Sequence, residues 1–161
     1  MGNAYTKKCS KCDYIFHASD GVGFLFPKVY DETLEKAKSG ELGQELKAFL
    51  EEHEDGAIDA SMSVFRCNNC GELANYINLT MYIPKNNTKN EENEMWSIPF
   101  PFKGGDYVMP LDLKLYYTEY AKYPHKCEKC GMDMTIVEDG KNILCPKCKN
   151  PLEDFELILW D

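Results

Sequence analysis

Short apolar runs flank tight cysteine pairs in the first half of the chain. Ala4–Thr6 leads into a Cys-x-x-Cys pair at residues 9–12 and Tyr14–Phe16 follows it, while Met62–Phe65 and Tyr76–Tyr82 flank a second pair. Short runs rich in aromatic and β-branched residues, placed on either side of a tight turn, are typical of strands. The pattern therefore predicts two strand–turn–strand units.

The segment between these two units shows helical spacing instead. Its apolar residues recur every three or four positions on two faces, formed by Tyr30, Leu34 and Ala37 and by Leu42, Leu46, Phe49 and Leu50. Asp31 is placed to cap the first helix, and Gly40 and Gly56 mark the ends of the two helices. We therefore expect a helical hairpin over about residues 29–55, with an acidic solvent face near its end at Glu51–Asp55.

An aromatic segment follows a polar stretch in the middle of the chain. Residues 85–94 (KNNTKNEENE) are typical of an exposed loop or linker and offer the best domain boundary. After them, Trp96, Ile98, Phe100 and Phe102 alternate with serine and proline. Proline withholds its amide, so this segment suits an edge strand or an extended strap. Packed inward these side chains would cover a core, and left exposed they would form a strip that binds a partner protein.

The eight cysteines carry the clearest chemistry. All of them fall in Cys-x-x-Cys pairs, namely Cys9/Cys12, Cys67/Cys70, Cys127/Cys130 and Cys145/Cys148. Two intervening residues allow a tight turn, or knuckle, that directs both sulfurs at one metal ion. Gly71 and Gly131 follow two of the pairs and suit a left-handed turn, whereas Asp13 and Lys149 at the same place suggest different turns. Two knuckles supply four ligands, so the sequence predicts two four-cysteine sites.

Spacing predicts which knuckles share a metal ion. The third and fourth pairs are separated by 14 residues, close to a zinc-binding spacing, which leaves the first pair to the second by elimination. Four thiolates close each site, so we expect structural Zn²⁺, two per chain. Iron is the alternative at the C-terminal site, because tetrahedral sulfur ligands suit either metal. Disulfides and thioredoxin-like chemistry are disfavoured, since there is no export signal and no pair opens a helix after a strand.

The C-terminal part is predicted to be a compact ribbon. Met132–Val137 and Phe155–Trp160 have the composition of strands, with a hairpin turn at Asp139-Gly140. Residues 125–160 resemble the zinc-ribbon or rubredoxin-like knuckle family, through CEKCG and CPKC. The whole chain resembles a group of bacterial zinc-ribbon proteins that have no assigned activity. The resemblance implies metal binding and little else, because one fold hosts many functions.

These elements together predict a β-rich α+β protein made of two zinc-ribbon-like units. The first would span residues 1–90, with the helical hairpin inserted in it, and the second residues 91–161, with the aromatic segment as its lead-in. No apolar run is long enough to cross a bilayer, and the N-terminus lacks a signal-peptide pattern. We therefore expect a cytoplasmic protein.

The charged residues bear on whether the partner is a nucleic acid. The net charge is −9, and Arg66 is the one arginine among 18 cationic residues, which disfavours a large surface that reads DNA sequence. The cations within two residues of a cysteine are Lys7, Lys8, Lys11, Arg66, Lys126, Lys129, Lys147 and Lys149. They either offset the thiolate charge, which we favour, or form basic patches for nucleic acid. The nucleic-acid alternative would use Lys7, Lys8, Lys126 and Lys129.

No catalytic set is recognisable. His17, His53 and His125 do not lie in a metalloprotease motif, no nucleophile-elbow motif is present, and no cysteine is left over as a nucleophile. His125 is two residues from Cys127, where it would support the site or replace a lost ligand. We therefore expect a non-enzymatic adaptor that binds a protein partner. Its working surface would be Trp96–Phe102 or the acidic helix end, and a metal-dependent hydrolase is the further alternative.

Overall fold

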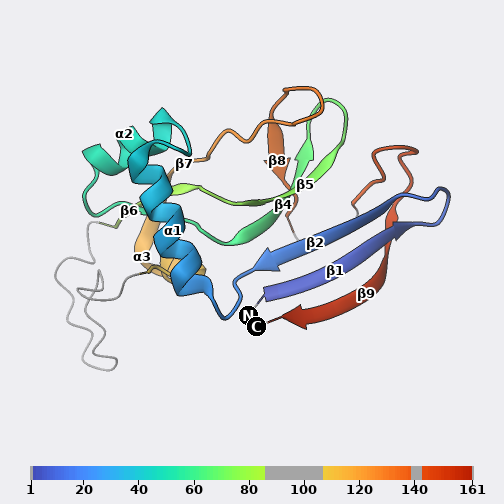
Figure 1. The fold of residues 1–161 in the computed structure, drawn as a ribbon, viewed down its shortest axis with the longest axis horizontal. Helices are drawn as coiled ribbons and strands as arrows, with labels where there is room; N and C mark the ends of the chain where they lie inside the picture. The colour runs from blue at the N-terminus through green and yellow to red at the C-terminus, as the bar shows by residue number, and fades with distance from the viewer. Residues whose placement is uncertain (1, 86–106, 139–142, 161) are drawn as a thin grey trace. The chain divides into compact units, whose positions relative to one another are not determined.

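The computed structural model describes residues 2–85, 107–138 and 143–160, with the backbone alone over 157–160. The protein has the predicted α+β composition and divides into two compact units (Figure 1). Unit 1 contains Met1–Phe24, Ser61–Ile77 and Pro124–Asp161, and unit 2 contains Leu25–Ala60 and Asn78–Tyr123. These boundaries differ from the expected division at residue 90, because the chain passes repeatedly between the two units.

Unit 1 is built on a six-stranded antiparallel sheet in the part of the chain that the structure describes. Its strands are β1 (Gly2–Cys9), β2 (Ile15–Gly21), β4 (Met62–Cys67), β5 (Leu73–Ile77), β8 (Met134–Ile136) and β9 (Leu152–Trp160). The order is β5-β4-β2-β1-β9, and β8 pairs with β4. The strands predicted around the first cysteine pair and before the second are therefore present as β1, β2 and β4.

Two strand ladders connect distant parts of the chain in unit 1. The β1–β9 ladder runs from Gly2 opposite Trp160 to Cys9 opposite Leu152. The shorter β4–β8 ladder places Cys67 opposite Met134. Each ladder contributes residues to a buried cluster, and both clusters include cysteines together with aliphatic or aromatic side chains. The cysteine knuckles at the strand ends are thus part of the core of unit 1.

Unit 2 contains the helices and a three-stranded sheet of order β3-β6-β7. Its elements are α1 (Phe26–Ser39), α2 (Gln44–Glu52), β3 (Ala57–Ile58), β6 (Met81–Pro84), α3 (Pro110–Tyr116) and β7 (Tyr117–Ala121). The predicted hairpin is confirmed, and Gly40 ends α1 in a left-handed conformation with φ of 85°. Helix α1 begins earlier than expected, at Phe26 rather than near Asp31, because Pro27 has the fixed φ that suits the first helical turn.

The run from Tyr76 to Tyr82 does not form the single strand that its apolar content predicted. Strand β5 ends at Ile77 and β6 begins at Met81, and the two strands belong to different units. Between them Leu79 has φ of 62°, and Oδ1 of Asn78 accepts a hydrogen bond from the amide of Thr80 at 3.2 Å. This turn interrupts the strand and redirects the chain.

Several predictions fall on residues that the structure does not describe. They concern most of the polar stretch 85–94, the aromatic residues from Trp96 to Phe102 and the turn at Asp139-Gly140. Within the described residues, no helix is long and apolar enough to cross a membrane. The predicted strand at Met132–Val137 is present in shorter form as β8.

Candidate metal centres

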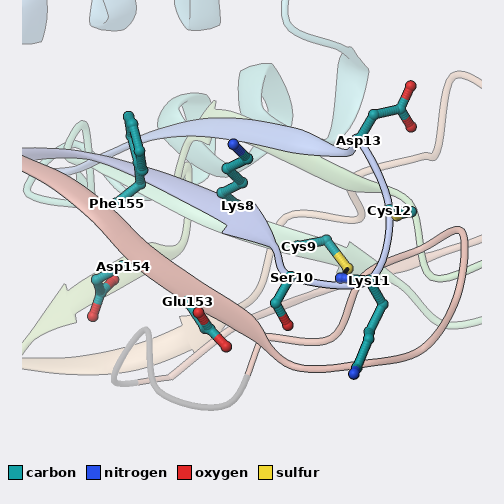
Figure 2. Close-up of a pocket in the computed structure, with 9 residues that line it drawn as sticks. All are labelled: Lys8, Cys9, Ser10, Lys11, Cys12, Asp13, Glu153, Asp154 and Phe155. Atoms are coloured by element: carbon teal, nitrogen blue, oxygen red, sulfur yellow. Dashed lines mark hydrogen bonds between the residues drawn. The ribbon is translucent and has the colours of Figure 1, made fainter.

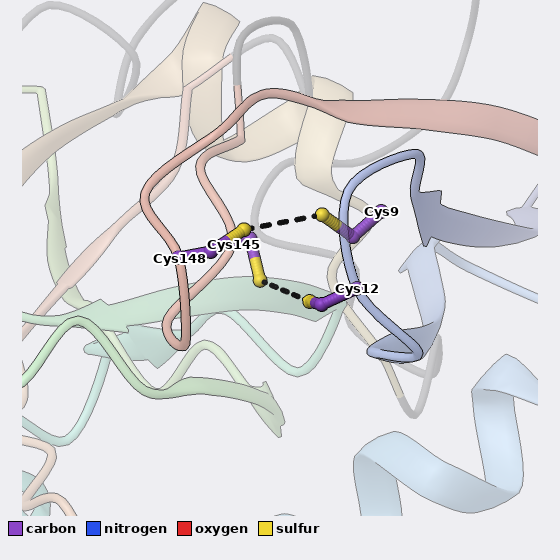
Figure 3. Close-up of side chains that lie close together, drawn as sticks. All are labelled: Cys9, Cys12, Cys145 and Cys148. Carbon is purple, nitrogen blue, oxygen red and sulfur yellow. Dashed lines mark hydrogen bonds between the residues drawn. The ribbon is translucent and has the colours of Figure 1, made fainter.

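The first group of cysteines, centre 1, lies where β1 ends and the chain approaches β9. The sulfurs of Cys9, Cys12, Cys145 and Cys148 lie within 4.8 Å of one another. Across the group, Sγ of Cys9 is 3.3 Å from Sγ of Cys148, and Sγ of Cys12 is 3.6 Å from Sγ of Cys145 (Figure 3). Two knuckles thus face each other, with the first cysteine of one beside the second cysteine of the other.

The second group, centre 2, repeats this arrangement between β4 and β8. The sulfurs of Cys67, Cys70, Cys127 and Cys130 again lie within 4.8 Å of one another. Sγ of Cys67 is 3.4 Å from Sγ of Cys130, and Sγ of Cys70 is 3.7 Å from Sγ of Cys127. The two centres therefore share one geometry although their sequences differ.

Both groups have the chemistry of a tetrahedral metal site. Four sulfurs bound at about 2.3 Å to one metal ion lie roughly 3.8 Å apart, close to the observed separations. None of the eight cysteines is in a disulfide. The first cysteine of each knuckle is buried and the second is partly exposed. Each group could therefore hold one metal ion with a complete set of four thiolate ligands.

The pairing of knuckles expected from their spacing is wrong. The sequence predicted that Cys127/Cys130 would join Cys145/Cys148 and that Cys9/Cys12 would join Cys67/Cys70, whereas each knuckle joins another partner. The physical reason is strand pairing, since the β1–β9 ladder brings the first knuckle to the fourth and the β4–β8 ladder brings the second to the third. The separate C-terminal ribbon with its own metal site is consequently not formed.

All four knuckles close with the same backbone hydrogen bond. The amide of the first cysteine donates to the carbonyl five residues later at 2.8 to 3.0 Å, in the pairs Cys9–Tyr14, Cys67–Glu72, Cys127–Met132 and Cys145–Asn150. In three knuckles, the amide directly after the second cysteine also donates to the first cysteine's carbonyl; it belongs to Gly71, Gly131 and Lys149. The knuckle is therefore a local structure whose closure depends on residues nearby in sequence.

The residue after the second cysteine is left-handed in those same three knuckles. The φ angles are 77° at Gly71, 72° at Gly131 and 62° at Lys149. The two glycines confirm the prediction made for their positions. Asp13 has no positive φ, so its turn differs as expected, but Lys149 adopts the left-handed turn in spite of its side chain.

Hydrogen bonds to sulfur favour the thiolate at one cysteine of each centre. The amide of Cys70 donates to Sγ of Cys67 at 3.5 Å and lowers the pKa of Cys67 to about 6. Nδ2 of Asn150 donates to Sγ of Cys148 at 3.3 Å and lowers the pKa of Cys148 to about 6. The thiolate is the form that binds a metal ion. Sequence reasoning missed Asn150, whose one signal was an amide side chain two residues beyond a knuckle.

Several cations near the knuckles are engaged in ion pairs among the described residues. The pairs are Lys7–Asp154 at 2.6 Å, Lys126–Asp133, Lys129–Glu72 at 3.1 Å and Lys147–Asp13 at 3.2 Å. Two of these pairs join facing knuckles. At centre 1, Lys147 lies inside one knuckle and Asp13 directly follows the other. At centre 2, Lys129 lies inside one knuckle and Glu72 lies two residues beyond the other. These cations are consequently placed to offset local negative charge.

The three histidines lie outside both cysteine groups. His125 is buried, and its ring stacks on Tyr76 with centroids 5.3 Å apart, while its centroid lies 4.2 Å from that of Phe65. It therefore packs beside centre 2 and is not among the groups that could hold the metal ion. Nδ1 of His17 lies 3.0 Å from Oγ1 of Thr6, and His53 packs between aromatic rings of unit 2.

A shallow hollow borders each centre. The hollow beside centre 1 has a volume of about 660 Å³ and is lined by Lys8–Asp13 and Glu153–Phe155 (Figure 2). The hollow beside centre 2 has a volume of about 390 Å³. Among the residues lining them, we find no nucleophile held by a base and an orienting group, the arrangement that covalent catalysis needs. Both hollows are lined by cysteines of the adjacent group together with charged and apolar side chains.

Comparison with known proteins gives no further assignment. No protein-family model, no curated protein and no solved structure matches the chain. What these centres do is therefore inferred from their own residues and geometry.

Proposed function

We propose that this chain is a non-enzymatic binding protein whose fold is held together by two structural zinc ions, one in each cysteine group. The observation that carries the proposal is that each group offers four converging thiol sulfurs. Catalytic zinc sites keep a position open for water or substrate beside three protein ligands, whereas structural sites are closed by four. A closed thiolate site supplies stability and no reactive position.

The proposed zinc ions join segments that are far apart in the sequence. Centre 1 links the end of β1 to the approach to β9, and centre 2 links β4 to the segment before β8. A structural zinc ion contributes on the order of 10–16 kcal/mol of apparent binding free energy in model peptides, comparable to or above the whole stability of many domains. The ions would therefore secure the sheet of unit 1, where long-range strand pairing has a high entropic cost.

The metal assignment has a direct test. Native mass spectrometry and elemental analysis of protein purified without a chelator should find two zinc ions per chain. Alkylation after denaturation should show eight reduced thiols in the same preparation. One metal ion per chain, or iron in place of zinc at either centre, would contradict the assignment and reopen the redox alternative.

The class of partner is inferred from the net charge and from the ion pairs that lysines near the cysteines form. The proposed partner is a protein rather than a nucleic acid, because Lys7, Lys126 and Lys129 are each paired with a carboxylate and the chain carries a net charge of −9. Basic patches that bind phosphates need cations free of such partners.

Two surfaces are proposed for the protein partner. One is the aromatic set Trp96, Ile98, Phe100 and Phe102, which lies outside the described residues. The other is the end of α2, where Glu51, Glu52 and Glu54 are exposed. A basic, apolar segment of a partner would complement both surfaces.

A pull-down from native cytosol tests this part of the proposal. The wild-type chain should capture a protein that survives nuclease treatment, and the double variant Trp96→Ala/Phe100→Ala should lose it. The charge variant Glu35→Ala on α1 is the control and should retain the partner. Salt-dependent binding of single-stranded DNA or RNA by the purified chain would instead favour the nucleic-acid alternative.

A further inference from the structure

Lys149 occupies a backbone conformation that glycine would fill more easily. It follows Cys148 directly and has φ of 62°, where the equivalent residues of two other knuckles are Gly71 and Gly131. In L-residues with a side chain, this left-handed region brings Cβ too close to the backbone and is sparsely populated. Glycine would form this turn more easily than lysine, so turn formation alone does not account for the lysine side chain at this position.

The side chain of Lys149 extends from the knuckle of centre 1 and contacts a residue of centre 2. Its Nζ donates a hydrogen bond to the carbonyl oxygen of Cys70 at 3.2 Å. Cys70 belongs to centre 2, while Cys148, the neighbour of Lys149 in sequence, belongs to centre 1. Both centres lie within unit 1. One side chain thus connects a knuckle of centre 1 to a knuckle of centre 2.

The absence of a side chain at Gly71, the neighbour of Cys70, makes room for this contact. A Cβ added at Gly71 would lie 3.0 Å from Nζ of Lys149 and 3.7 Å from a guanidinium nitrogen of Arg66. The missing side chain therefore leaves the space that the Lys149 ammonium occupies. Two cations consequently gather beside the knuckle of Cys67 and Cys70, where they offset thiolate charge.

We propose that Lys149 couples the two centres, so that metal binding at one raises the affinity of the other; the proposal rests on both centres binding zinc. Metal at centre 1 fixes Cys148 and hence the turn from which Lys149 extends. The Lys149 ammonium then holds the carbonyl of Cys70, the residue whose amide donates to Sγ of Cys67. Linkage requires the effect to be reciprocal.

The variant Lys149→Gly separates coupling from a role in the turn. Glycine relieves the left-handed strain, so the turn itself should form at least as well as in the wild type. The variant removes the hydrogen bond to Cys70 and with it the proposed coupling. Lys149→Arg keeps a cationic donor and should retain part of the coupling. Lys122→Gly is the matched charge control, because Lys122 is an exposed cation of unit 2 that lies outside both cysteine groups.

The readout is the distribution of species with no, one and two zinc ions, followed by native mass spectrometry as zinc is added to the full-length apoprotein. We expect the ratio of the second to the first stepwise binding constant to fall roughly fivefold in Lys149→Gly, the scale of one charge-assisted hydrogen bond at an exposed site. The ratio should stay near wild type in Lys122→Gly.

Three outcomes would overturn the inference in distinguishable ways. Two zinc ions with an unchanged ratio in Lys149→Gly would remove the coupling role and leave the two structural sites standing. An equal fall in Lys122→Gly and Lys149→Gly would assign the effect to general charge loss. Fewer than two zinc ions in the wild type would remove the proposed function, and the coupling with it.

Discussion

Nζ of Lys147 lies 3.2 Å from Oδ1 of Asp13, although 134 residues separate them in sequence. Lys147 lies inside one knuckle of centre 1 and Asp13 directly follows the facing knuckle, and Lys129 with Glu72 forms a similar pair at centre 2. With the pairing expected from spacing, Asp13 and Glu72 would lie at one site. Lys129 and Lys147 would lie at the other. The observed pairing places opposite charges together at both centres. The charges next to the cysteines thus agree with the pairing that the strand ladders impose.

Removal of zinc should unfold unit 1 and spare much of unit 2. All helices among the described residues belong to unit 2, which has its own buried cluster around Ala57, Leu113 and Tyr117. We expect excess chelator to abolish the cooperative melt of the sheet and expose the cysteines, while most helical circular dichroism at 222 nm remains. Unchanged thermal melting after complete removal of zinc would contradict a structural role for the metal.

Replacement of one cysteine should reveal which knuckles share a metal ion. In Cys145→Ser, centre 1 loses a ligand, so Cys9, Cys12 and Cys148 should become alkylated rapidly by iodoacetamide. Cys127 should stay protected, since it belongs to centre 2. Peptide mapping after a short alkylation pulse measures this directly. Rapid alkylation of Cys127 with protection of Cys9 would support the pairing expected from spacing instead.

Reversal of one charge at centre 1 should weaken metal binding modestly. Lys147→Glu places a second carboxylate beside Asp13, and we expect zinc affinity to fall about two- to fivefold because the pair is exposed to solvent. The double variant Asp13→Lys/Lys147→Glu restores opposite charges and should recover most of the loss. Competition with a chromophoric chelator measures both effects. Lys122→Glu in unit 2 controls for net charge, and an equal loss in that variant would contradict a local effect.

Stability should rise with pH between about 6 and 9. Hydrogen bonds lower the pKa of Cys148 from 9.0 to about 6, chiefly through the Asn150 side chain. A group whose pKa is lowered on folding stabilises the folded chain fully above its unfolded pKa, and this contribution disappears as the pH falls through the folded value. Protons also compete with zinc for the same thiolate. The melting temperature of the zinc-loaded chain measured across this range should therefore increase with pH.

The variant Asn150→Ala provides the control for this pH dependence. It removes the Nδ2 donor to Sγ of Cys148 and keeps the backbone carbonyl that closes the knuckle. The rise of melting temperature with pH should become shallower than in the wild type. Asn69→Ala, an exposed side chain in the second knuckle, should leave the slope unchanged. A melting temperature that is flat or falling from pH 6 to 9 in the wild type would contradict stabilisation of the folded chain by the Cys148 thiolate.

Gly56→Ala should destabilise unit 2. A Cβ at this position would lie 2.8 Å from Cζ of Phe49 and 3.0 Å from the carbonyl oxygen of His53. Because Phe49 is buried, the overlap has to be relieved by shifting the core, at about 1–3 kcal/mol. Urea unfolding followed at 222 nm measures the loss, and Glu54→Ala at an exposed neighbouring position is the control. A midpoint equal to that of Glu54→Ala would show that the core accommodates the methyl group without strain.

The sequence by itself determined the local structures of this protein. Each knuckle closes through hydrogen bonds within six residues of chain, so the motif and the following glycine, as at Gly71, were sufficient to predict the turn. The strands on either side of the first knuckle and the helices α1 and α2 followed from apolar spacing for the same reason. Their periodicity is set by residues close to one another in the chain.

Only the tertiary structure decided which knuckles meet. Spacing favoured neighbours in sequence, but strand ladders joined Cys9 to the approach of β9 and Cys67 to β8. The reach of Lys149 to Cys70 likewise depends on a contact between distant segments. A knuckle supplies two thiolates whatever its partner. Which knuckle joins which is therefore determined by the pairing and register of the strands, because these bury apolar faces over the whole length of each strand.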